Sequence, residues 1–329
     1  MDVVFTAIMH AVVLAGGYAT RLWPITRNRP KMLLPIGEQT VIGTVFEELE
    51  ADDRISDVYV STNQKFASVF ESHLANTEFD KPTLSVEDTT GEAEKFGVVG
   101  ALAQLVEREN LTEDTLIIAG DNLICFDVAD FLDEFHADDA PLIAAHDIGS
   151  YERASSYGLV ELDGEEVVAF QEKPDNPKST LVSIACYAFP GEILSQFETY
   201  LAGDNNPDEP GWFIQWLQTR QRVRSFTFEE PWFDIGTPDS YLDAVSWYLD
   251  GRNAIHPEAT VEDTTLQGNV HIMSDAEISD VTLSDTVVFP EARISESEVH
   301  RSLIDTDTDI TGLNLSGAVI GAHTQLNGK

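Results

Sequence analysis

The sequence has few cysteines, few cations and no long apolar segment, and each scarcity argues against a class of protein. Cys125 and Cys186 are its two cysteines in 329 residues, which argues against a disulfide framework and favours two separate buried thiols in a reducing cytosol. The longest apolar runs, such as Ala11–Ala15, are far too short to cross a bilayer, and no signal peptide opens the sequence. We therefore expect a cytoplasmic protein that has no membrane partner.

Cations are scarce: 19 lysines and arginines face 58 aspartates and glutamates, which gives a net charge of −39. A basic face that binds nucleic acid is therefore not expected. Such an acidic surface repels itself at ordinary salt, but at salt on the order of 1 M the screening length is about 3 Å and most of that repulsion disappears. We infer a halophilic source. The alternative is an acidic surface that binds cations or basic partners, and the dispersed charge disfavours it.

The region from about residue 10 to residue 250 alternates strand-like apolar runs with helical patterns. The expected strands cover residues 10–15, 57–62, 84–87, 115–119, 140–146, 167–172, 182–189 and 222–228. The expected helices cover residues 40–50, 64–74, 98–109, 128–136, 191–201 and 238–250. Strands separated by helices of this size predict a mostly parallel, Rossmann-like α/β sheet in a domain over residues 9–251. Whether residues 1–8 belong to the folded protein is left open.

After residue 250 the helical patterns vanish and a repeat begins. Its first aliphatic series recurs every 16 or 17 residues, at Ile255, Ile272, Val288, Ile304 and Ile320. Two further series follow six and eleven residues behind the first: Val261, Ile278, Ile294, Ile310 and Leu326, then Leu266, Leu283, Val299 and Leu315. Three aliphatic corners per coil predict a triangular parallel β-helix over residues 252–329. The pattern resembles the left-handed β-helix of hexapeptide-repeat proteins. We expect this domain to have a packing role or to join copies of the chain into a homo-oligomer.

A glycine-rich segment follows the first expected strand, from Leu14 to Pro24, and Lys31 stands shortly after it. Gly16 and Gly17 let main-chain N–H groups approach a phosphate or a base edge. Arg21 offers a bidentate phosphate donor, and Lys31, one of seven lysines in the chain, adds a mobile charge. The segment is neither a P-loop nor a dinucleotide fingerprint, because it lacks Gly-Lys-Ser/Thr and a third glycine.

With the downstream Pro-Lys, this segment resembles the signature of the sugar-1-phosphate nucleotidyltransferases, and the resemblance covers nearly the whole chain. It implies a nucleotidyltransferase sheet followed by a left-handed β-helix. It also implies that Arg21 contacts the NTP phosphates and that Lys31 lies near the reacting phosphates. The implied nucleotide-binding residues are Leu14, Ala15, Gly16, Gly17, Thr20, Arg21 and Gly97.

Two aspartates stand in further motifs of the family. Asp121 follows a buried strand in Gly-Asp-Asn, where an aspartate alone would be read as a helix cap. Asp234 stands in Trp-Phe-Asp-Ile-Gly-Thr, which is similar to the family's Trp-x-Asp-x-Gly-Thr. The resemblance implies that both carboxylates bind Mg²⁺, which needs only one or two carboxylates because water and phosphate oxygens complete its octahedron.

Two more motifs resemble those with which the family binds the sugar phosphate. Tyr157 and Gly158 resemble the family's Tyr-Gly-Val, in which the glycine lets the sugar ring approach closely. Glu172 and Lys173 resemble its Glu-Lys-Pro, in which the glutamate accepts sugar hydroxyls and the lysine holds the phosphate. The implied catalytic set is therefore Arg21, Lys31, Asp121, Lys173 and Asp234.

The sequence departs from the family at three places. Ala19 stands where glycine is usual, so a positive φ there would be costly. Residues 97–102 resemble the base-contacting Gly-Thr-Ala-Gly-Ala-Leu but lack its hydroxyl, and residues 183–187 replace Asn-x-Gly-x-Tyr. The residues implied to bind phosphate match the family, whereas those implied to contact the base and the sugar differ from it. The sequence therefore indicates the reaction class more firmly than the substrates.

The expected reaction transfers a nucleotidyl group from an NTP to a sugar 1-phosphate and releases pyrophosphate. Glucose 1-phosphate with UTP or dTTP is the choice by family frequency. The alternatives are a mannose-1-phosphate guanylyltransferase and a non-catalytic paralogue that binds nucleotide or sugar phosphate as a regulator. An additional acyltransferase in the β-helix would need a histidine base, for which His271, His300 and His323 are available.

Overall fold

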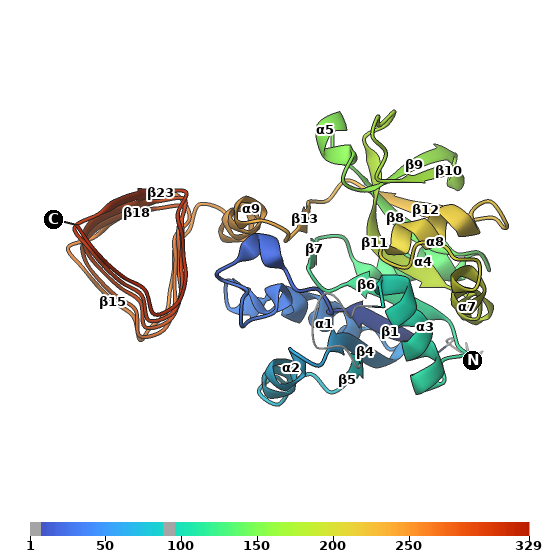
Figure 1. Ribbon diagram of the computed structural model, residues 1–329, viewed down its shortest axis with the longest axis horizontal. Coiled ribbons are helices and arrows are strands. Elements are labelled where there is room, and N and C mark those ends of the chain that lie inside the picture. The colour runs from blue at the N-terminus through green and yellow to red at the C-terminus, as the bar shows by residue number, and fades with distance from the viewer. Residues whose placement is uncertain (1–7, 88–95, 329) are drawn as a thin grey trace, which may run out of the picture. The chain divides into compact units, whose positions relative to one another are not determined.

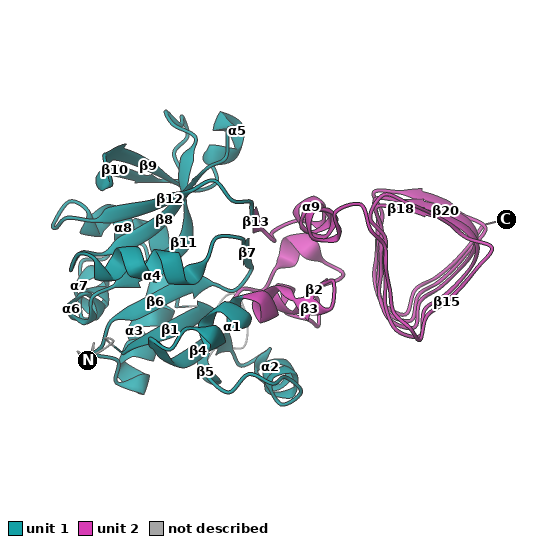
Figure 2. Cartoon of the chain, turned by 180° about the vertical axis from the view of Figure 1, so that it is seen from behind, with its two compact units in different colours: residues 1–16, 45–232 teal, residues 17–44, 233–329 magenta. Residues whose placement is uncertain are grey.

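The computed structural model describes residues 8–87 and 96–328, which form two compact units (Figures 1 and 2). Unit 1 comprises Met1–Gly16 and Val45–Trp232, and unit 2 comprises Gly17–Thr44 and Phe233–Lys329. The units thus group residues 17–44 with the C-terminal part of the chain, whereas the domains expected from the sequence meet at residue 251. That domain boundary stays a prediction, and residues 1–7 lie outside the described part.

Unit 1 is built on a nine-stranded sheet with the order β5-β4-β1-β6-β11-β8-β12-β10-β9. Its strands are β1 (Met9–Leu14), β4 (Ile55–Asn63), β5 (Pro82–Glu87), β6 (Thr115–Ala119), β8 (Leu142–Asp147), β9 (Gly158–Asp163), β10 (Glu166–Glu172), β11 (Leu181–Phe189) and β12 (Arg224–Phe228). Strands β5, β4, β1 and β6 pair in parallel, as do β8 and β12. Strand β11 runs antiparallel to β6, β8 and β9, and β10 runs antiparallel to β9 and β12.

The expectation of a mostly parallel sheet is therefore wrong: the sheet is mixed. Strand β9, which the sequence analysis did not predict, joins β10 through the two residues 164–165, and a link this short permits only an antiparallel hairpin. Gly164 has the positive φ (64°) that such a turn requires. Strand β11 reads as a continuous apolar run like a buried parallel strand, but apolar patterning reports burial and not strand direction.

The helices of unit 1 follow the expected ranges with a few differences. They are α1 (Val41–Ala51), which begins in unit 2, α2 (Ala67–Leu74), α3 (Val98–Glu109), α4 (Val128–His136), α5 (Tyr151–Ala154), α6 (Gly191–Leu194), α7 (Gln196–Leu201) and α8 (Pro210–Leu217). The helix expected over 191–201 is divided into α6 and α7, and the sequence analysis missed α5 and α8. Side chains of α3, α6, α7 and α8 form one buried cluster with the sheet, in which the ring centroids of Phe197 and Phe213 are 4.5 Å apart.

Both cysteines are free thiols, as expected, but only one of them is buried. Cys186 is buried and Cys125 is half-buried. None of the described helices has an apolar stretch long enough to cross a bilayer.

Unit 2 begins with short elements and one long helix. They are η1 (Thr20–Leu22), η2 (Lys31–Leu33), β2 (Pro35–Ile36), β3 (Gln39–Thr40) and α9 (Pro238–Leu249). Strands β7 (Asn122–Ile124) and β13 (Trp232–Asp234) are also short, and β13 crosses from unit 1 into unit 2. Helix α9 begins at a capping box in which Thr237 accepts from the N–H of Ser240. The Tyr241 hydroxyl of α9 donates to the Pro35 carbonyl at 2.7 Å, which ties the segment 17–44 to this helix.

Residues 254–327 of unit 2, called the C-terminal coils from here on, stack parallel strands (Figure 1). One sheet is β14 (Ala254–Ile255), β17 (His271–Ile272), β19 (Val287–Val288), β21 (Leu303–Ile304) and β24 (Val319–Ile320). The other is β15 (Thr260–Glu262), β18 (Glu277–Ser284), β20 (Arg293–His300), β22 (Asp309–Thr311) and β25 (Gln325–Asn327), with β16 (Thr265–Gln267) on β18 and β23 (Asn314–Ser316) on β20.

The register of these strands confirms the three aliphatic series. Ile255 pairs with Ile272, which pairs with Val288, and the second and third series pair in the same way. Their inner members form one buried cluster. The stacking is thus as expected, while the left-handed sense of the coil stays a prediction.

Each coil turns at residues with a positive φ, a conformation that the sequence analysis did not foresee. The turning residues stack in three rows: Asp263, Asp280, Glu296 and Gly312; Gly268, Asp285, Arg301 and Gly317; Asp275, Glu291, Asp307 and His323. Aspartate and glycine tolerate this conformation best, which accounts for their frequency at the turns.

Candidate active site

The parallel pairing of β1 with β6 brings the turn at Leu14–Gly16, called the glycine turn from here on, and Asp121 to one edge of the sheet of unit 1. Leu14 pairs with Ala119, so the two strands end side by side. The N–H of Gly120 donates to the Leu14 carbonyl at 3.0 Å, which places the next residue, Asp121, beside the turn. Ligands of open α/β sheets collect at this carboxyl edge.

Two residues at the same edge were missed by the sequence analysis. Asn63 ends β4 and donates through Nδ2 to the Gly16 carbonyl at 2.7 Å. Glu87 ends β5, is buried, and lies so close that a Cβ on Gly16 would be 3.1 Å from its Oε1. A residue larger than glycine would therefore crowd the Glu87 carboxylate. Both are polar residues at the ends of buried strands, which is the signal that could have found them.

The segment after the turn carries Thr20, Arg21 and Lys31, all in unit 2 with Gly17. Arg21 lies in η1 and Lys31 begins η2. Ala19 precedes η1 with a φ of 49°, so the residue that replaces the family's glycine does adopt the strained conformation. Its carbonyl accepts from the Thr26 hydroxyl at 2.8 Å, which holds the segment closed on itself.

Within unit 2, Arg21 and Asp234 meet beside Gly236. A Cβ built on Gly236 would lie 3.1 Å from Nη2 of Arg21 and 3.5 Å from Oδ1 of Asp234. The glycine of the Trp-Phe-Asp-Ile-Gly-Thr motif therefore leaves room for the guanidinium next to the carboxylate. Two of the predicted catalytic residues, 213 positions apart in the chain, are brought together here.

Within unit 1, the predicted sugar-phosphate residues gather around Glu172. Gly158 pairs with Glu172 across β9 and β10, and a Cβ on Gly158 would lie 2.8 Å from its Oε2. Gly211 of α8 approaches the same carboxylate so closely that a Cβ there would overlap it. Burial raises the pKa of Glu172 to about 7, with Lys173 opposing the rise and Glu209 adding to it. Gly158 and Gly211 thus leave space for the carboxyl group of Glu172, whose pKa is near neutrality.

Lys173 has a positive φ of 44°, and its N–H donates to the Tyr157 carbonyl at 3.0 Å. Its ammonium forms an ion pair with Glu209, the residue before α8. The Tyr157 ring packs edge-on against Trp232 with centroids 5.3 Å apart. All four predicted sugar-phosphate residues therefore lie together, and Glu209 and Gly211 join them through a helix that the sequence analysis did not predict.

Gly97 belongs to the predicted base-contacting loop. Its φ is 76°, and a Cβ there would overlap the Pro207 carbonyl, which accepts from the N–H of Val99 at 2.9 Å. This packing explains why the position holds glycine, while its contact with a base stays a prediction.

Asp121 belongs to unit 1 and Asp234 to unit 2, so a shared Mg²⁺ ion stays a prediction. The donors fit the ion by chemistry, because both are carboxylates, the hard oxygen ligands that Mg²⁺ prefers. Asp121 also stands beside the glycine turn and Asp234 beside Arg21, the places where phosphate oxygens would complete the coordination.

The three histidines considered for acyl transfer have different surroundings. His271 is buried, which lowers its pKa to about 4. Nδ1 of His300 lies 2.6 Å from the Ser284 hydroxyl, and Nδ1 of His323 lies 2.9 Å from Asp307 Oδ2 on the preceding coil. Burial favours a structural role for His271, while the acyltransferase alternative stays a prediction.

Comparison with known proteins finds relatives that cover most of the chain. Bifunctional protein GlmU of Methanocaldococcus jannaschii is 26% identical over 272 residues, which are 82% of this chain and 61% of that protein. The chain also spans 62% of the length of the corresponding Methanococcus aeolicus protein. Glucose-1-phosphate thymidylyltransferase of Streptomyces griseus is 25% identical over 342 residues, with 97% of this chain and 93% of that protein covered.

A solved structure of UDP-glucose pyrophosphorylase complexed with UDP-glucose has a TM-score of 0.62 at 22% identity, and covers 74% of this chain and 100% of its own. It shows that the fold is shared. The sequence profile of the nucleotidyl transferase family matches residues 10–251, which hold every predicted site residue. The chain therefore belongs to the nucleotidyl transferase family.

Proposed function

We propose that the protein is a sugar-1-phosphate nucleotidyltransferase that joins an NTP to a sugar 1-phosphate and releases pyrophosphate. The observation that carries the proposal is the sheet edge at which Asp121 stands beside the Leu14–Gly16 turn, because that edge is where a nucleotide phosphate would meet both main-chain donors and a carboxylate. Glucose 1-phosphate with UTP or dTTP is the proposed substrate pair.

In the proposed reaction, an oxygen of the sugar 1-phosphate attacks the α-phosphorus of the NTP. The new phosphorus–oxygen bond forms as the bond to the bridging oxygen breaks, and pyrophosphate leaves with that electron pair. The attacking oxygen is already anionic, so no general base is needed and catalysis rests on alignment and charge neutralisation. Lys173 would hold the attacking phosphate, Glu172 would accept sugar hydroxyls, and Arg21 and Lys31 would hold the NTP phosphates.

Asp121 and Asp234 would hold Mg²⁺, which, when bound, neutralises charge on the phosphates. Lys173 forms an ion pair with Glu209. When the sugar phosphate binds, its oxygens would replace the Glu209 carboxylate as the partner of the Lys173 ammonium. In the proposed mechanism Glu209 therefore pairs with Lys173 only while no sugar phosphate is bound.

The test is pyrophosphate release from a matrix of NTPs and sugar 1-phosphates at high salt. Asp121→Ala should lower turnover about 10²-fold or more, since the phosphates lose a charge-neutralising ligand. Asp53→Ala, which removes an exposed aspartate far along the chain from the motifs, is the matched control and should keep wild-type turnover. Near-normal release by folded Asp121→Ala protein would remove Asp121 from the mechanism.

The same matrix separates the alternatives. GTP with mannose 1-phosphate as the fastest pair would make the protein a mannose-1-phosphate guanylyltransferase. Tight nucleotide binding without magnesium-dependent turnover would identify a regulatory paralogue.

We further propose that the C-terminal coils form a left-handed β-helix through which the chain forms a homo-oligomer. The stacked register and the aliphatic corners support the coil. Sedimentation of the full chain at high salt tests the oligomer, and a monomer at micromolar concentration would contradict it.

A further inference from the structure

The segment that carries Arg21 and Lys31 packs on the C-terminal coils inside unit 2. Residues 17–44 and the coils belong to the same compact unit. At Gly321 the coil approaches the segment so closely that a Cβ would lie 2.8 Å from Cβ and Cγ of Pro24. Glycine at this position therefore permits a direct contact between the two parts.

Arg29 makes the polar part of this contact. Its Nη2 donates to Oδ1 of Asp305 at 3.3 Å and to the Thr306 hydroxyl at 3.4 Å. The guanidinium also lies 4.6 Å from the centroid of the Phe289 ring, within the range of a cation–π interaction. Phe289 and Asp305 directly follow β19 and β21, so Arg29 contacts the same corner of two successive coils.

The contact is largely withdrawn from water. The side chains of Asp305 and Arg29 are 5% and 27% exposed, and Phe289 is buried. Salt screens a partly buried ion pair much less than a surface pair, so this pair persists at the high ionic strength that the net charge calls for. Removal of either partner would leave the other charge uncompensated in a low-dielectric place.

The segment has little regular structure of its own to hold Arg21 and Lys31 in place. Before α1, which begins at Val41, its described elements are two three-residue 3₁₀ helices, η1 and η2, and the two-residue strands β2 and β3. Arg29 stands two residues before Lys31 and eight after Arg21. The position of both cations therefore depends on tertiary contacts such as that of Arg29.

We propose that Arg29 and Asp305 are positioning residues through which the C-terminal coils place Arg21 and Lys31 for the NTP phosphates. The inference rests on the proposed function, in which these cations hold the triphosphate. Loss of the pair lets the segment move, which weakens NTP binding and leaves the Glu172–Lys173 site of unit 1 unchanged. The coils then have a role in substrate binding although they supply no group that touches substrate.

The experiment compares steady-state pyrophosphate release by full-length Asp305→Ala, Arg29→Ala and Asp305→Asn proteins with that by the wild type. We expect the KM for the NTP to rise roughly tenfold in the alanine variants and less in Asp305→Asn, which keeps the shape and one acceptor, because misplacement by about 1 Å can cost 10²-fold. The KM for the sugar 1-phosphate should stay unchanged. Arg293→Ala is the matched control, since that arginine pairs with Glu277 and Asp307 within the coils.

A purely structural pair would lower the thermal midpoint without this split between the two KM values, and that outcome would overturn the proposal. So would wild-type constants in folded Asp305→Ala and Asp305→Asn proteins. Calorimetric titration of the same variants with UTP gives a second readout. If the wild type releases no pyrophosphate with any pair of substrates, the proposed function fails. The titration then tests the positioning role of Arg29 and Asp305 by itself: weaker UTP binding by the variants would support that role, and unchanged UTP affinity would reject it.

Discussion

Two alanines stand where the family has glycine, and both occupy a conformation that disfavours a side chain. Ala19 has a φ of 49° and Ala185 a φ of 55°. An L-residue in this region costs roughly 1–2 kcal/mol, which the surrounding structure must offset. The strain lies just after the glycine turn and in β11, so both departures from the family pattern mark strained positions.

Ala185→Gly should therefore raise the free energy of unfolding by about 0.5–1 kcal/mol, because relief of the strain exceeds the added entropy of the unfolded chain. Ala188→Gly in the same strand is the control: Ala188 is buried without a positive φ and its loss should destabilise the protein. Urea unfolding monitored by circular dichroism compares the two. A destabilised Ala185→Gly protein would contradict the account.

The buried carboxyl of Glu172 makes the stability depend on pH. Its pKa in the folded protein, about 7, lies above the ordinary value of 4.5, so folding favours the protonated form. The associated stability is present below the ordinary value and is lost as the pH rises through 7.

Relative to Glu172→Gln, the wild type should lose on the order of 2–3 kcal/mol of unfolding free energy between pH 5 and pH 8. Urea unfolding at both pH values measures the difference. Glu161→Gln on the exposed part of β9 is the control and should follow the wild type. Parallel profiles for wild type and Glu172→Gln would show that Glu172 is not the group responsible.

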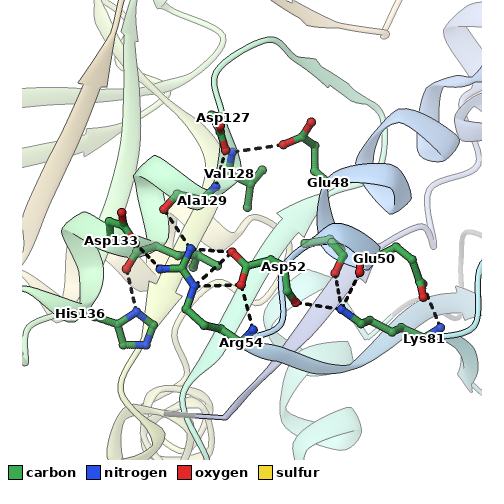
Figure 3. Close-up of polar contacts among 12 residues, drawn as sticks. Glu48, Glu50, Asp52, Arg54, Lys81, Asp127, Val128, Ala129, Asp133 and His136 are labelled. Carbon is green, nitrogen blue, oxygen red and sulfur yellow. Dashed lines mark hydrogen bonds and ion pairs between the residues drawn. The ribbon is translucent and has the colours of Figure 1, made fainter. Parts of the chain in front are cut away.

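At the scale of elements, Arg54 joins α1, β4 and α4 (Figure 3). It stands just before β4 and donates through Nε to Oδ1 of Asp52 at 2.9 Å and through Nη2 to the Ala129 carbonyl at 3.1 Å. It also contacts Asp133 of α4 at 2.5 Å. The hydrogen bonds from Arg54 to Asp52 hold the pKa of Asp52 below its ordinary value, although burial opposes the shift. One side chain thus connects the ends of three elements.

Arg54→Ala should cost roughly 3 kcal/mol, because it leaves the largely buried Asp52 without its partner. Arg222→Ala, which removes a half-exposed arginine paired with Asp138 and Glu166, should cost no more than about 1 kcal/mol. A lowered carboxyl pKa contributes stability that is lost as the pH falls, so the Arg54→Ala deficit should narrow below about pH 4. Equal losses in the two variants at neutral pH would contradict the assignment.

At the scale of the whole molecule, the net charge of −39 should dominate the response to salt. In the C-terminal coils acidic residues are stacked: Asp275, Glu291 and Asp307 occupy the same turn on successive coils, about one strand spacing of 4.8 Å apart. Like charges at such a distance repel each other in dilute salt and are screened in concentrated salt.

The free energy of unfolding should therefore rise between 0.1 M and 2 M KCl, with most of the gain below about 1 M, where the screening length falls from about 10 Å to about 3 Å. Thermal unfolding across that range measures the effect. Equal midpoints at 0.1 M and 2 M would speak against adaptation to salt.

Features that depend on local periodicity were determined by the sequence alone. Three aliphatic series predicted which coil residues stack, since each corner is buried only on the corresponding corner of the next coil. Helices α3 and α4 begin and end where the pattern places them, and Ala19 was recognised as a residue that a positive φ would strain.

Only the tertiary structure decided which distant segments meet. Periodicity reports whether a residue is buried but names neither its partner nor the direction of its strand, so a mostly parallel sheet was expected although β11 runs antiparallel to its neighbours. The ion pair of Lys173 with Glu209 and the approach of Gly211 to Glu172 depend on α8, an eight-residue helix that the sequence analysis did not predict. The segment 17–44 has little periodic structure, and its association with the C-terminal coils comes from long-range contacts such as that of Arg29 with Asp305.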